Sequence, residues 1–288
     1  MRRVFILGVK TRLSLSQAQA LFPNRDITSL EATKRGVIDT TYRVYTNSQN
    51  YILKKYERAS SLQIEEEQDL LNKLSQSSLN VPKPIESVNE WHLFSLLAGE
   101  IPHKISLQQL RSIGNFLGRF HWKLRHHPSS FRPFTQQEYR TTLAQLRKKK
   151  LLYSKRLSAL NDFPQEIDGI IHGDLFCDNS KFDGAILAVF DFIEAGSGSF
   201  TFDLGVVAMS WVAKKRLSTL QLQILLQAYN QQVKKKIVLD DLYTMIHYAA
   251  LVYSLKRFMN PDSTLDYKEM LAVDKKIEHF KKNSSFKR

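Results

Sequence analysis

The chain reads IHGDLFCDN at residues 171–179, and FDF follows at residues 190–192. Apolar residues on either side predict two β-strands, 169–172 and 186–192, that pair around the polar stretch 173–184. Asp174, Asn179 and Asp191 are the polar groups that converge there. An aspartate between two phenylalanines in an apolar strand is costly to bury without a cation or a hydrogen-bond donor. These residues therefore predict a polar site rather than part of the core.

The spacing of these residues indicates phosphoryl transfer. The pattern His-x-Asp-x-x-x-x-Asn, with an aspartate on the following strand, has the spacing of a kinase catalytic loop. That chemistry needs a carboxylate to deprotonate a hydroxyl, and carboxylate or amide oxygens to hold Mg²⁺ against the phosphates. We expect Asp174 to be the catalytic base, and Asn179 and Asp191 to be metal ligands. The alternative is a polar loop in which the aspartates are turn residues.

The N-terminal part of the chain contains residues suited to a nucleotide. Lys54 ends an apolar strand, 51–54, and is predicted to reach the α and β phosphates of ATP. Glu67 shares a helix face with leucines of the segment 62–74 and is predicted to hold that lysine in place. Lys55, on the opposite face of the strand, is the rival, and a surface lysine with a solvated acid is the alternative for the pair. The further candidate nucleotide contacts are Gly36, Thr40, Ser95 and Leu96.

Three strings of the sequence resemble those of a known superfamily. HGDLFCDN (172–179), FDF (190–192) and FDLGVV (202–207) are similar to the aminoglycoside phosphotransferases and choline kinases, and the match spans nearly the whole chain. The pattern resembles bacterial type II homoserine kinases in particular. GVIDTTY (36–42) stands where they carry a GIENTNY-like loop, and LAVFDFIEAG (187–196) where they carry a GVIDFYFAG-like strand. The late segment AALVYSLKRFM (249–259) is also similar. Two departures are Cys177, where the family has Arg or Pro, and Ser180, where an apolar residue is usual.

The resemblance implies an α+β fold with two lobes, like that of protein kinases. It implies ATP and Mg²⁺ as cofactors, Asp174 as base, Asn179 and Asp191 as metal ligands, and His172 and Asp203 as supports of the loop. The implied reaction transfers the γ-phosphoryl group to a hydroxyl of a small molecule, either homoserine or a related amino alcohol. An aminoglycoside- or choline-type kinase and a non-catalytic nucleotide-binding pseudokinase are the alternatives.

Hydrophobic periodicity predicts a small strand-rich lobe, 1–97, and a larger helical lobe, 98–288. The resemblance implies that the first binds the nucleotide and that the second carries catalysis and the substrate. In the first lobe we expect a helix at 14–22, a hairpin of 37–45 with 51–54, a helix at 62–74 and a strand at 91–97. The helices predicted for the second lobe are 107–120, 140–160, 204–215, 219–235, 240–259 and 266–280.

The composition limits the class of protein. Lys and Arg number 42 against 28 Asp and Glu, for a net charge of +14, which suits anionic partners such as nucleotides. The basic residues lie in separate runs at helix edges, so we expect no nucleic-acid binding. The single cysteine excludes an internal disulfide and a cysteine-based zinc site.

We expect His121, His126 and His127 at the surface. No stretch approaches the roughly 20 apolar residues of a spanning helix, so we expect a cytoplasmic protein with no export signal and no membrane contact. The sequence makes no prediction of the oligomeric state.

Overall fold

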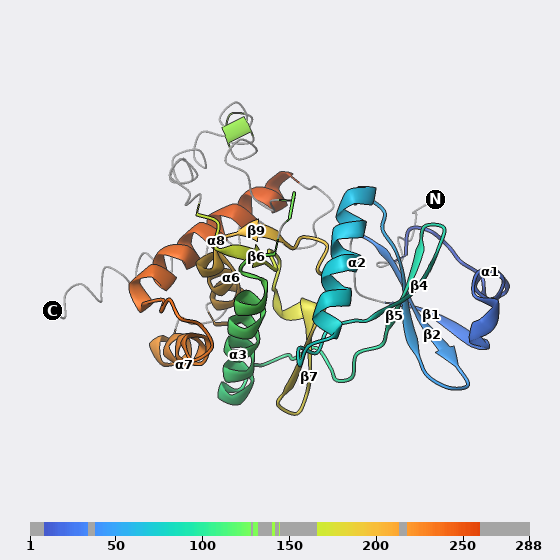
Figure 1. Cartoon of the computed structure of the whole chain (residues 1–288), viewed down its shortest axis with the longest axis horizontal. Coiled ribbons are helices and arrows are strands. Elements are labelled where there is room, and N and C mark those ends of the chain that lie inside the picture. The colour runs from blue at the N-terminus through green and yellow to red at the C-terminus, as the bar shows by residue number, and fades with distance from the viewer. Residues whose placement is uncertain are drawn as a thin grey trace, which may run out of the picture. The chain divides into compact units, whose positions relative to one another are not determined.

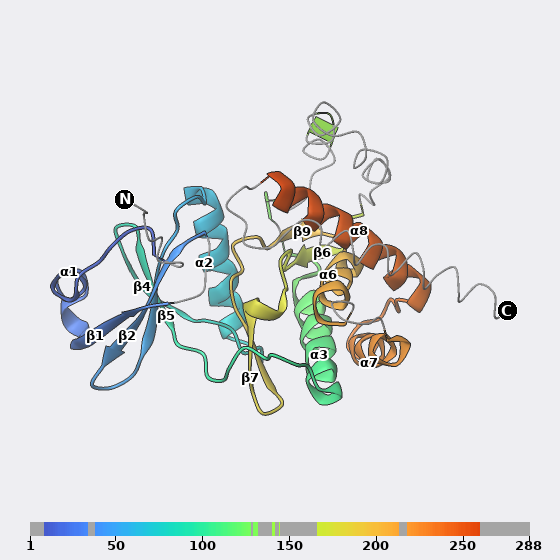
Figure 2. The same ribbon diagram turned by 180° about the vertical axis from the view of Figure 1, so that it is seen from behind.

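The computed structural model describes residues 9–33, 38–127, 129–131, 140–141, 144, 166–212 and 218–259. The chain divides into two compact units, Met1–Ala98 and Gly99–Arg288. Figures 1 and 2 show a strand-rich N-terminal unit and a helical C-terminal unit, which confirms the predicted α+β fold class. Within the described residues, no helix is both long and apolar enough to cross a membrane.

The N-terminal unit is built on a five-stranded antiparallel sheet in the order β1-β2-β3-β5-β4. Its elements are α1 (Leu15–Leu21), η1 (Pro23–Arg25), β1 (Ile27–Ala32), β2 (Thr40–Thr46), β3 (Tyr51–Lys55), α2 (Ser61–Ser75), β4 (Pro84–Val88) and β5 (Trp91–Ser95). The predicted hairpin is β2 with β3, in a register that pairs Thr41 with Lys54. Ser14 and Ser60 cap the two helices with reciprocal hydrogen bonds to glutamines at the third helical position.

The two faces of this sheet carry different helices. Tyr51 and Leu53 of β3 pack into an apolar cluster with Ala18 and Phe22 from the α1 region. Helix α2 lies on the other side of the sheet (Figures 1 and 2). Because side chains alternate along a strand, Lys54 projects to the face opposite Leu53. The same alternation places the side chains of Lys54 and Lys55 on opposite faces of the sheet.

Sequence patterning does not predict two edge strands of this sheet. Only Ile27 of β1 is buried, and the apolar residues Ile27, Leu30 and Ala32 do not alternate regularly with polar ones, so the strand lacks a clear apolar pattern. β4 begins at Pro84, a residue confined to sheet edges and strand starts because it has no backbone N–H. The predicted strand 91–97 ends at Ser95.

The C-terminal unit combines helices with two small sheets. Its elements are α3 (Leu107–Leu124), β6 (Gly169–Ile171), η3 (Cys177–Asn179), β7 (Ser180–Asp183), β8 (Ile186–Val189), β9 (Gly196–Gly198), α6 (Phe200–Val207), the π-helical turn η4 (Ala208–Val212), α7 (Thr219–Asn230) and α8 (Leu239–Met259). The predicted helix 266–280 lies outside the described residues, as does nearly all of 140–160.

The predicted pairing of strands 169–172 and 186–192 is wrong. β6 pairs with β9, where Ile170 faces Ser197, and β7 pairs with β8, where Ser180 faces Val189. β9 is the tripeptide GSG, whose composition carries no strand signal. A Cβ atom on Gly198 would lie 2.5 Å from Cδ1 of Ile171, so glycine lets the two strands pair without displacing that side chain.

Two glycines of α3 let it pack closely against α7. A Cβ atom on Gly114 would lie 2.5 Å from the carbonyl oxygen of Leu225, and one on Gly118 would lie 2.8 Å from that of Tyr229. The backbones therefore approach to a distance that no larger residue allows. This packing brings the last turn of α3 against Tyr229 of α7.

Candidate active site

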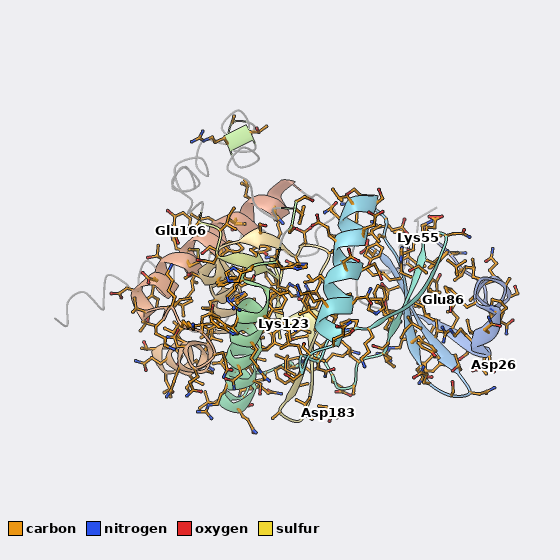
Figure 3. All side chains as sticks on the ribbon, in the orientation of Figure 1. Asp26, Lys55, Glu86, Lys123, Glu166 and Asp183 are labelled. Atoms are coloured by element: carbon orange, nitrogen blue, oxygen red, sulfur yellow. The ribbon has the colours of Figure 1, made fainter. Side chains whose placement is uncertain are left out.

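The β7–β8 hairpin brings Asn179 and Asp191 together. Asn179 immediately precedes β7, and the backbone N–H of Phe190, after β8, donates to its carbonyl oxygen at 3.0 Å. The pairing of Ser180 with Val189 thus places residues 179 and 190 opposite each other at the open end of the hairpin. Asp183 lies at the closed end (Figure 3). Antiparallel register therefore explains why the two residues are neighbours.

Asp174 and Asn179 are joined directly. The amide nitrogen Nδ2 of Asn179 donates to the carbonyl oxygen of Asp174 at 2.8 Å and to its carboxylate oxygen Oδ2 at 3.0 Å. Since Nδ2 faces Asp174, the remaining amide atom, Oδ1, is the one that can ligate a cation. The loop thus brings two of the three predicted site residues into contact.

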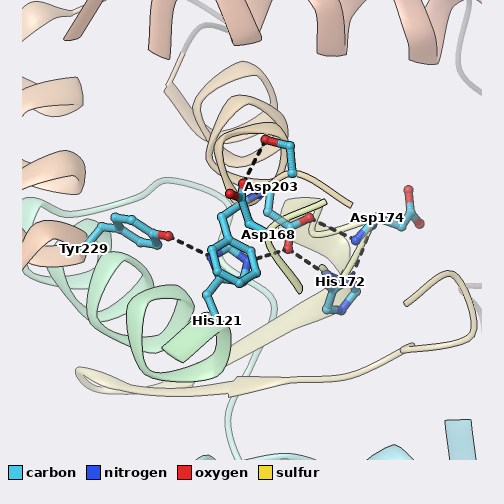
Figure 4. A network of polar contacts seen from close by, with 9 residues as sticks. His121, Asp168, His172, Asp174, Asp203 and Tyr229 are labelled. Atoms are coloured by element: carbon cyan, nitrogen blue, oxygen red, sulfur yellow. Dashed lines mark hydrogen bonds and ion pairs between the residues drawn. The ribbon is translucent and has the colours of Figure 1, made fainter. Parts of the chain in front are cut away.

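The carboxylate of Asp174 has unusual electrostatics. Burial raises the pKa of Asp174 to about 8; the positive charge of Lys256 opposes this shift, while Glu194 and Asp191 add to it. In Figure 4 the carboxylate points away from His172 and the polar network behind it. A partly buried carboxylate with a raised pKa is suited to accept a proton.

Asp191 has a strained backbone. Its φ is 68°, in the left-handed region that non-glycine residues rarely adopt. The predicted strand 186–192 accordingly ends at Val189, and Asp191 lies in the irregular segment between β8 and the turn at residues 193–194. Non-glycine residues in this conformation are concentrated at functional sites, where the surrounding fold maintains the strain.

Asp203 holds the backbone of the loop. Its Oδ2 accepts from the N–H of His172 at 2.6 Å and its Oδ1 from the N–H of Gly173 at 2.9 Å. Gly173 has a φ of 76°, which suits glycine. Its carbonyl oxygen accepts a hydrogen bond from the hydroxyl of Tyr253 in α8. Both backbone polar groups of Gly173 are therefore held by buried side chains.

His172 completes the loop from within. It is fully buried, its Nε2 lies 3.3 Å from the carbonyl oxygen of Phe190, and its Nδ1 accepts from the N–H of Asp174 at 3.3 Å. An acceptor at Nδ1 places the hydrogen on Nε2, which then donates to Phe190. Burial lowers the pKa of His172, in keeping with a neutral ring. This histidine connects the Asp174 loop to the strand that leads to Asp191.

The expectation that His121 lies at the surface is wrong. The side chain is fully buried; its Nε2 lies 3.1 Å from Oδ2 of Asp203 and its Nδ1 lies 3.0 Å from the Tyr229 hydroxyl (Figure 4). A carboxylate only accepts, so Nε2 carries the hydrogen. Among the neighbouring histidines, His126 is exposed as expected and His127 is half-buried. The spacing held a signal, because His121 lies four residues after the buried Leu117 on the inner face of α3.

The last turns of α8 supply charged and aromatic groups that the sequence analysis did not single out. Lys256 Nζ lies 2.9 Å from Oε2 of Glu194, three residues beyond Asp191. Arg257 lies over the ring of Phe176, with its Cζ 5.0 Å from the ring centroid. Both basic residues lie in the segment 249–259, which is similar to a segment of the homoserine kinases but contains no predicted site residue.

In the N-terminal unit, Tyr56 links Lys54 to Glu67. Lys54 Nζ lies 4.4 Å from the centroid of the Tyr56 ring, and the Tyr56 hydroxyl donates to the Glu67 carboxylate. Glu67 is buried, on the inner face of α2. Lys54 also pairs with Asp39, at 3.1 Å between Nζ and Oδ2, a residue that the sequence analysis passed over.

The rival lysine has a different environment. Lys55 pairs with Glu90, whose side chain is 62% exposed, in the turn between β4 and β5. The two lysines therefore occupy opposite faces of β3, and Lys54 is the one whose face carries α2.

The remaining nucleotide candidates are distributed over the same unit. Thr40 is fully buried; its hydroxyl accepts from the N–H groups of Lys10 and Thr11 at 2.9 Å each and donates to Glu57 at 2.6 Å. Its hydrogen-bonding capacity is thus filled by the protein. Ser95 ends β5 and pairs with Lys83 through its N–H and its hydroxyl, and Leu96 follows, half-buried. Gly36 lies outside the described residues.

The residues at the open end of the hairpin suit Mg²⁺. Asn179 and Asp191 offer an amide oxygen and a carboxylate, the hard oxygen ligands that Mg²⁺ prefers. Nowhere in the described part of the chain is a group of three or more His, Cys, Asp or Glu side chains arranged to hold a metal ion. Two protein ligands suffice for Mg²⁺ when substrate phosphates and water complete its shell.

Comparison with known proteins identifies the class. Residues 29–236 match the phosphotransferase enzyme family, known as APH. The chain belongs to this family, and the predicted class of enzyme, a phosphotransferase, is confirmed.

Relatives named homoserine kinase are similar to the chain. The protein from Methylobacillus glycogenes is 25% identical over 71% of this chain and 71% of its own length. The one from Polaromonas naphthalenivorans is 24% identical over 77% of this chain and 80% of its own length.

Solved structures share the fold. A macrolide 2'-phosphotransferase from Brachybacterium faecium has a TM-score of 0.64 at 18% identity, covering 91% of this chain and 96% of its own. A microcompartment-associated aminopropanol kinase has a TM-score of 0.60 at 18% identity, covering 92% of this chain and 94% of its own. The predicted two-lobed, kinase-like architecture is thereby confirmed.

Proposed function

We propose that this protein transfers the γ-phosphoryl group of ATP to the hydroxyl of a small amino alcohol, with homoserine as the first candidate. The observation that carries the proposal is the juxtaposition of Asp174, Asn179 and Asp191 at the open end of the β7–β8 hairpin. Family membership supports the reaction class. The relatives named homoserine kinase support the acceptor.

Asp174 is the proposed catalytic base. Its carboxylate takes the proton of the acceptor hydroxyl as the hydroxyl oxygen bonds to the γ-phosphorus. The bond between the γ-phosphorus and its bridging oxygen breaks, and ADP leaves with that electron pair. The hydrogen bond from Asn179 to Oδ2 orients the carboxylate. A pKa of about 8 favours proton acceptance near neutral pH.

Asn179 and Asp191 are the proposed ligands of Mg²⁺. The bound cation would neutralise charge on the phosphates of the nucleotide. The left-handed backbone at Asp191 is the kind of strain that is concentrated at functional sites, which supports this role. His172 and Asp203 position the loop and do not contact the substrate.

For the nucleotide we propose Lys54, supported by Tyr56 and Glu67, as the phosphate-binding lysine. Gly36, Ser95 and Leu96 are the further proposed contacts. The proposed site does not include Thr40, because its hydroxyl is fully used within the protein.

The test is ADP release from ATP and Mg²⁺ in the presence of homoserine, serine, threonine, choline, ethanolamine or an aminoglycoside. The Asp174→Asn variant removes the base, and we expect its turnover to fall by about 10²- to 10⁴-fold. Asp178→Asn is the matched control, since Asp178 lies in the same loop with an exposed side chain. Equal turnover in the Asp174 variant and the wild type would overturn the assignment of the base.

A further inference from the structure

An ion pair beside the Asp174 loop has no part in the proposed phosphoryl transfer. Lys256 Nζ lies 2.9 Å from Glu194 Oε2, and the two side chains are 36% and 34% exposed. A ligand can therefore reach both groups. Half-exposed ion pairs contribute little to stability, so a ligand that carries both charges can open this one at little cost.

Helix α8 fixes the position of this pair. Tyr253, just under one helical turn before Lys256, donates from its hydroxyl to the carbonyl oxygen of Gly173. Its ring lies edge-on to Phe176, with 4.6 Å between the centroids. The end of α8 is thus tied to residues on both sides of Asp174 in the sequence.

The same contacts place the pair near the candidate base. Lys256 lies three residues after Tyr253, whose hydroxyl binds the carbonyl oxygen of Gly173, next to Asp174. Its partner Glu194 lies three residues after Asp191. An acceptor whose hydroxyl meets Asp174 therefore has the ion pair in its neighbourhood.

We propose that Lys256 and Glu194 bind the zwitterionic backbone of an amino-acid acceptor, Lys256 its α-carboxylate and Glu194 its α-ammonium group. The inference rests on the proposed function and narrows its substrate class to a free hydroxy-amino acid such as homoserine. A zwitterion replaces the internal pair with two new pairs, so every charge keeps a partner.

Charge balance disfavours the other acceptors. A purely cationic acceptor, such as choline or an aminoglycoside, can pair with Glu194 but meets a like charge on Lys256. It has no carboxylate with which to engage that lysine. The like-charge contact selects against such ligands.

The experiment removes one charge from the protein and the matching charge from the acceptor. Homoserine is compared with 3-aminopropan-1-ol, which lacks the carboxylate, and with 4-hydroxybutanoate, which lacks the ammonium group. Each acceptor is assayed for phosphorylation with the wild type, Lys256→Met and Glu194→Gln. Lys235→Met is the control, because Lys235 is an exposed lysine 4.0 Å from Glu166 and 3.9 Å from Asp168.

We expect Lys256→Met to raise the KM for homoserine and for 4-hydroxybutanoate by about tenfold or more, and to leave that for 3-aminopropan-1-ol nearly unchanged. Glu194→Gln should raise the KM for homoserine and 3-aminopropan-1-ol by a similar factor and spare 4-hydroxybutanoate. Lys256→Arg keeps the charge and should retain the wild-type preference, which provides a second test should the methionine variant fold poorly.

Equal losses on all three acceptors, or no change in preference, would overturn this inference while phosphorylation by the wild type upheld the proposed function. Absence of transfer to any alcohol by the wild type would overturn the proposed function itself. The two failures are therefore distinguishable in one set of assays.

Discussion

The Asp174→Asn substitution should make the protein more stable as it removes the base. The pKa of Asp174 is about 8 in the folded chain, against an ordinary value of 3.8. Between these values the folded protein holds a proton that the unfolded chain has lost, so the ionisation of Asp174 opposes folding increasingly as pH rises. Each pH unit in this window changes the free energy of unfolding by up to about 1.4 kcal/mol.

Asparagine has no such dependence and still accepts the hydrogen bond from Asn179. Since the Asp174 side chain is only partly buried, water screens part of the effect, and we expect a gain of about 1–3 kcal/mol at pH 8. The assay is urea denaturation of both proteins, free of nucleotide and metal, near pH 5 and near pH 8. The gain should be larger at the higher pH. A wild type as stable as the variant at both pH values would refute the reasoning.

Three further substitutions test other parts of the structure. Thr40→Val removes the hydroxyl that serves two backbone N–H groups and Glu57, so urea denaturation should report a loss of about 2–4 kcal/mol; a loss below half of this would contradict the network. Gly118→Ala places a Cβ atom 2.8 Å from the carbonyl oxygen of Tyr229 and should lower the free energy of unfolding by about 1–3 kcal/mol; a stabilised variant would mean that α3 and α7 pack less closely than described. Asp203→Asn replaces one of the two carboxylate oxygens that accept from the loop's N–H groups with an NH₂ group, which can only donate. We expect kcat to fall by about 10- to 100-fold with the KM for ATP little changed. An unchanged kcat would exclude the positioning role.

The sequence predicts the local elements of this fold better than their partners. Hydrophobic periodicity predicts the β2–β3 hairpin and helices α2 and α3, because each has a regular buried face. Helix α8 is predicted from its long apolar run, and its residues 249–255 are buried in succession. It does not find β9, since Gly196–Gly198 carries no apolar pattern and depends on contact with Ile171. Strand pairing over a long sequence separation is a property of the packed chain, so it cannot be read from one segment.

The residues of the candidate site also differ in whether the sequence alone can predict that they are neighbours. Asp174 and Asn179 are predictable because they lie five residues apart on one loop, and the structure joins them by a hydrogen bond. Glu194 and Lys256 meet only through tertiary folding, at a separation of 62 residues. His121 could have been placed inside from its position on the apolar face of α3, had the helical spacing outweighed the polarity of its ring.

The central claim is that the chain transfers phosphoryl groups to an alcohol of a small molecule. Phosphorus NMR of a mixture of the protein, ATP, Mg²⁺ and homoserine tests this most directly, because it distinguishes a phosphomonoester from inorganic phosphate. The account predicts ADP together with a phosphomonoester of homoserine, formed in the wild type and lost with Asp174→Asn. Conversion of ATP to ADP and inorganic phosphate alone, or unchanged ATP, with homoserine and every other alcohol of the panel would contradict it.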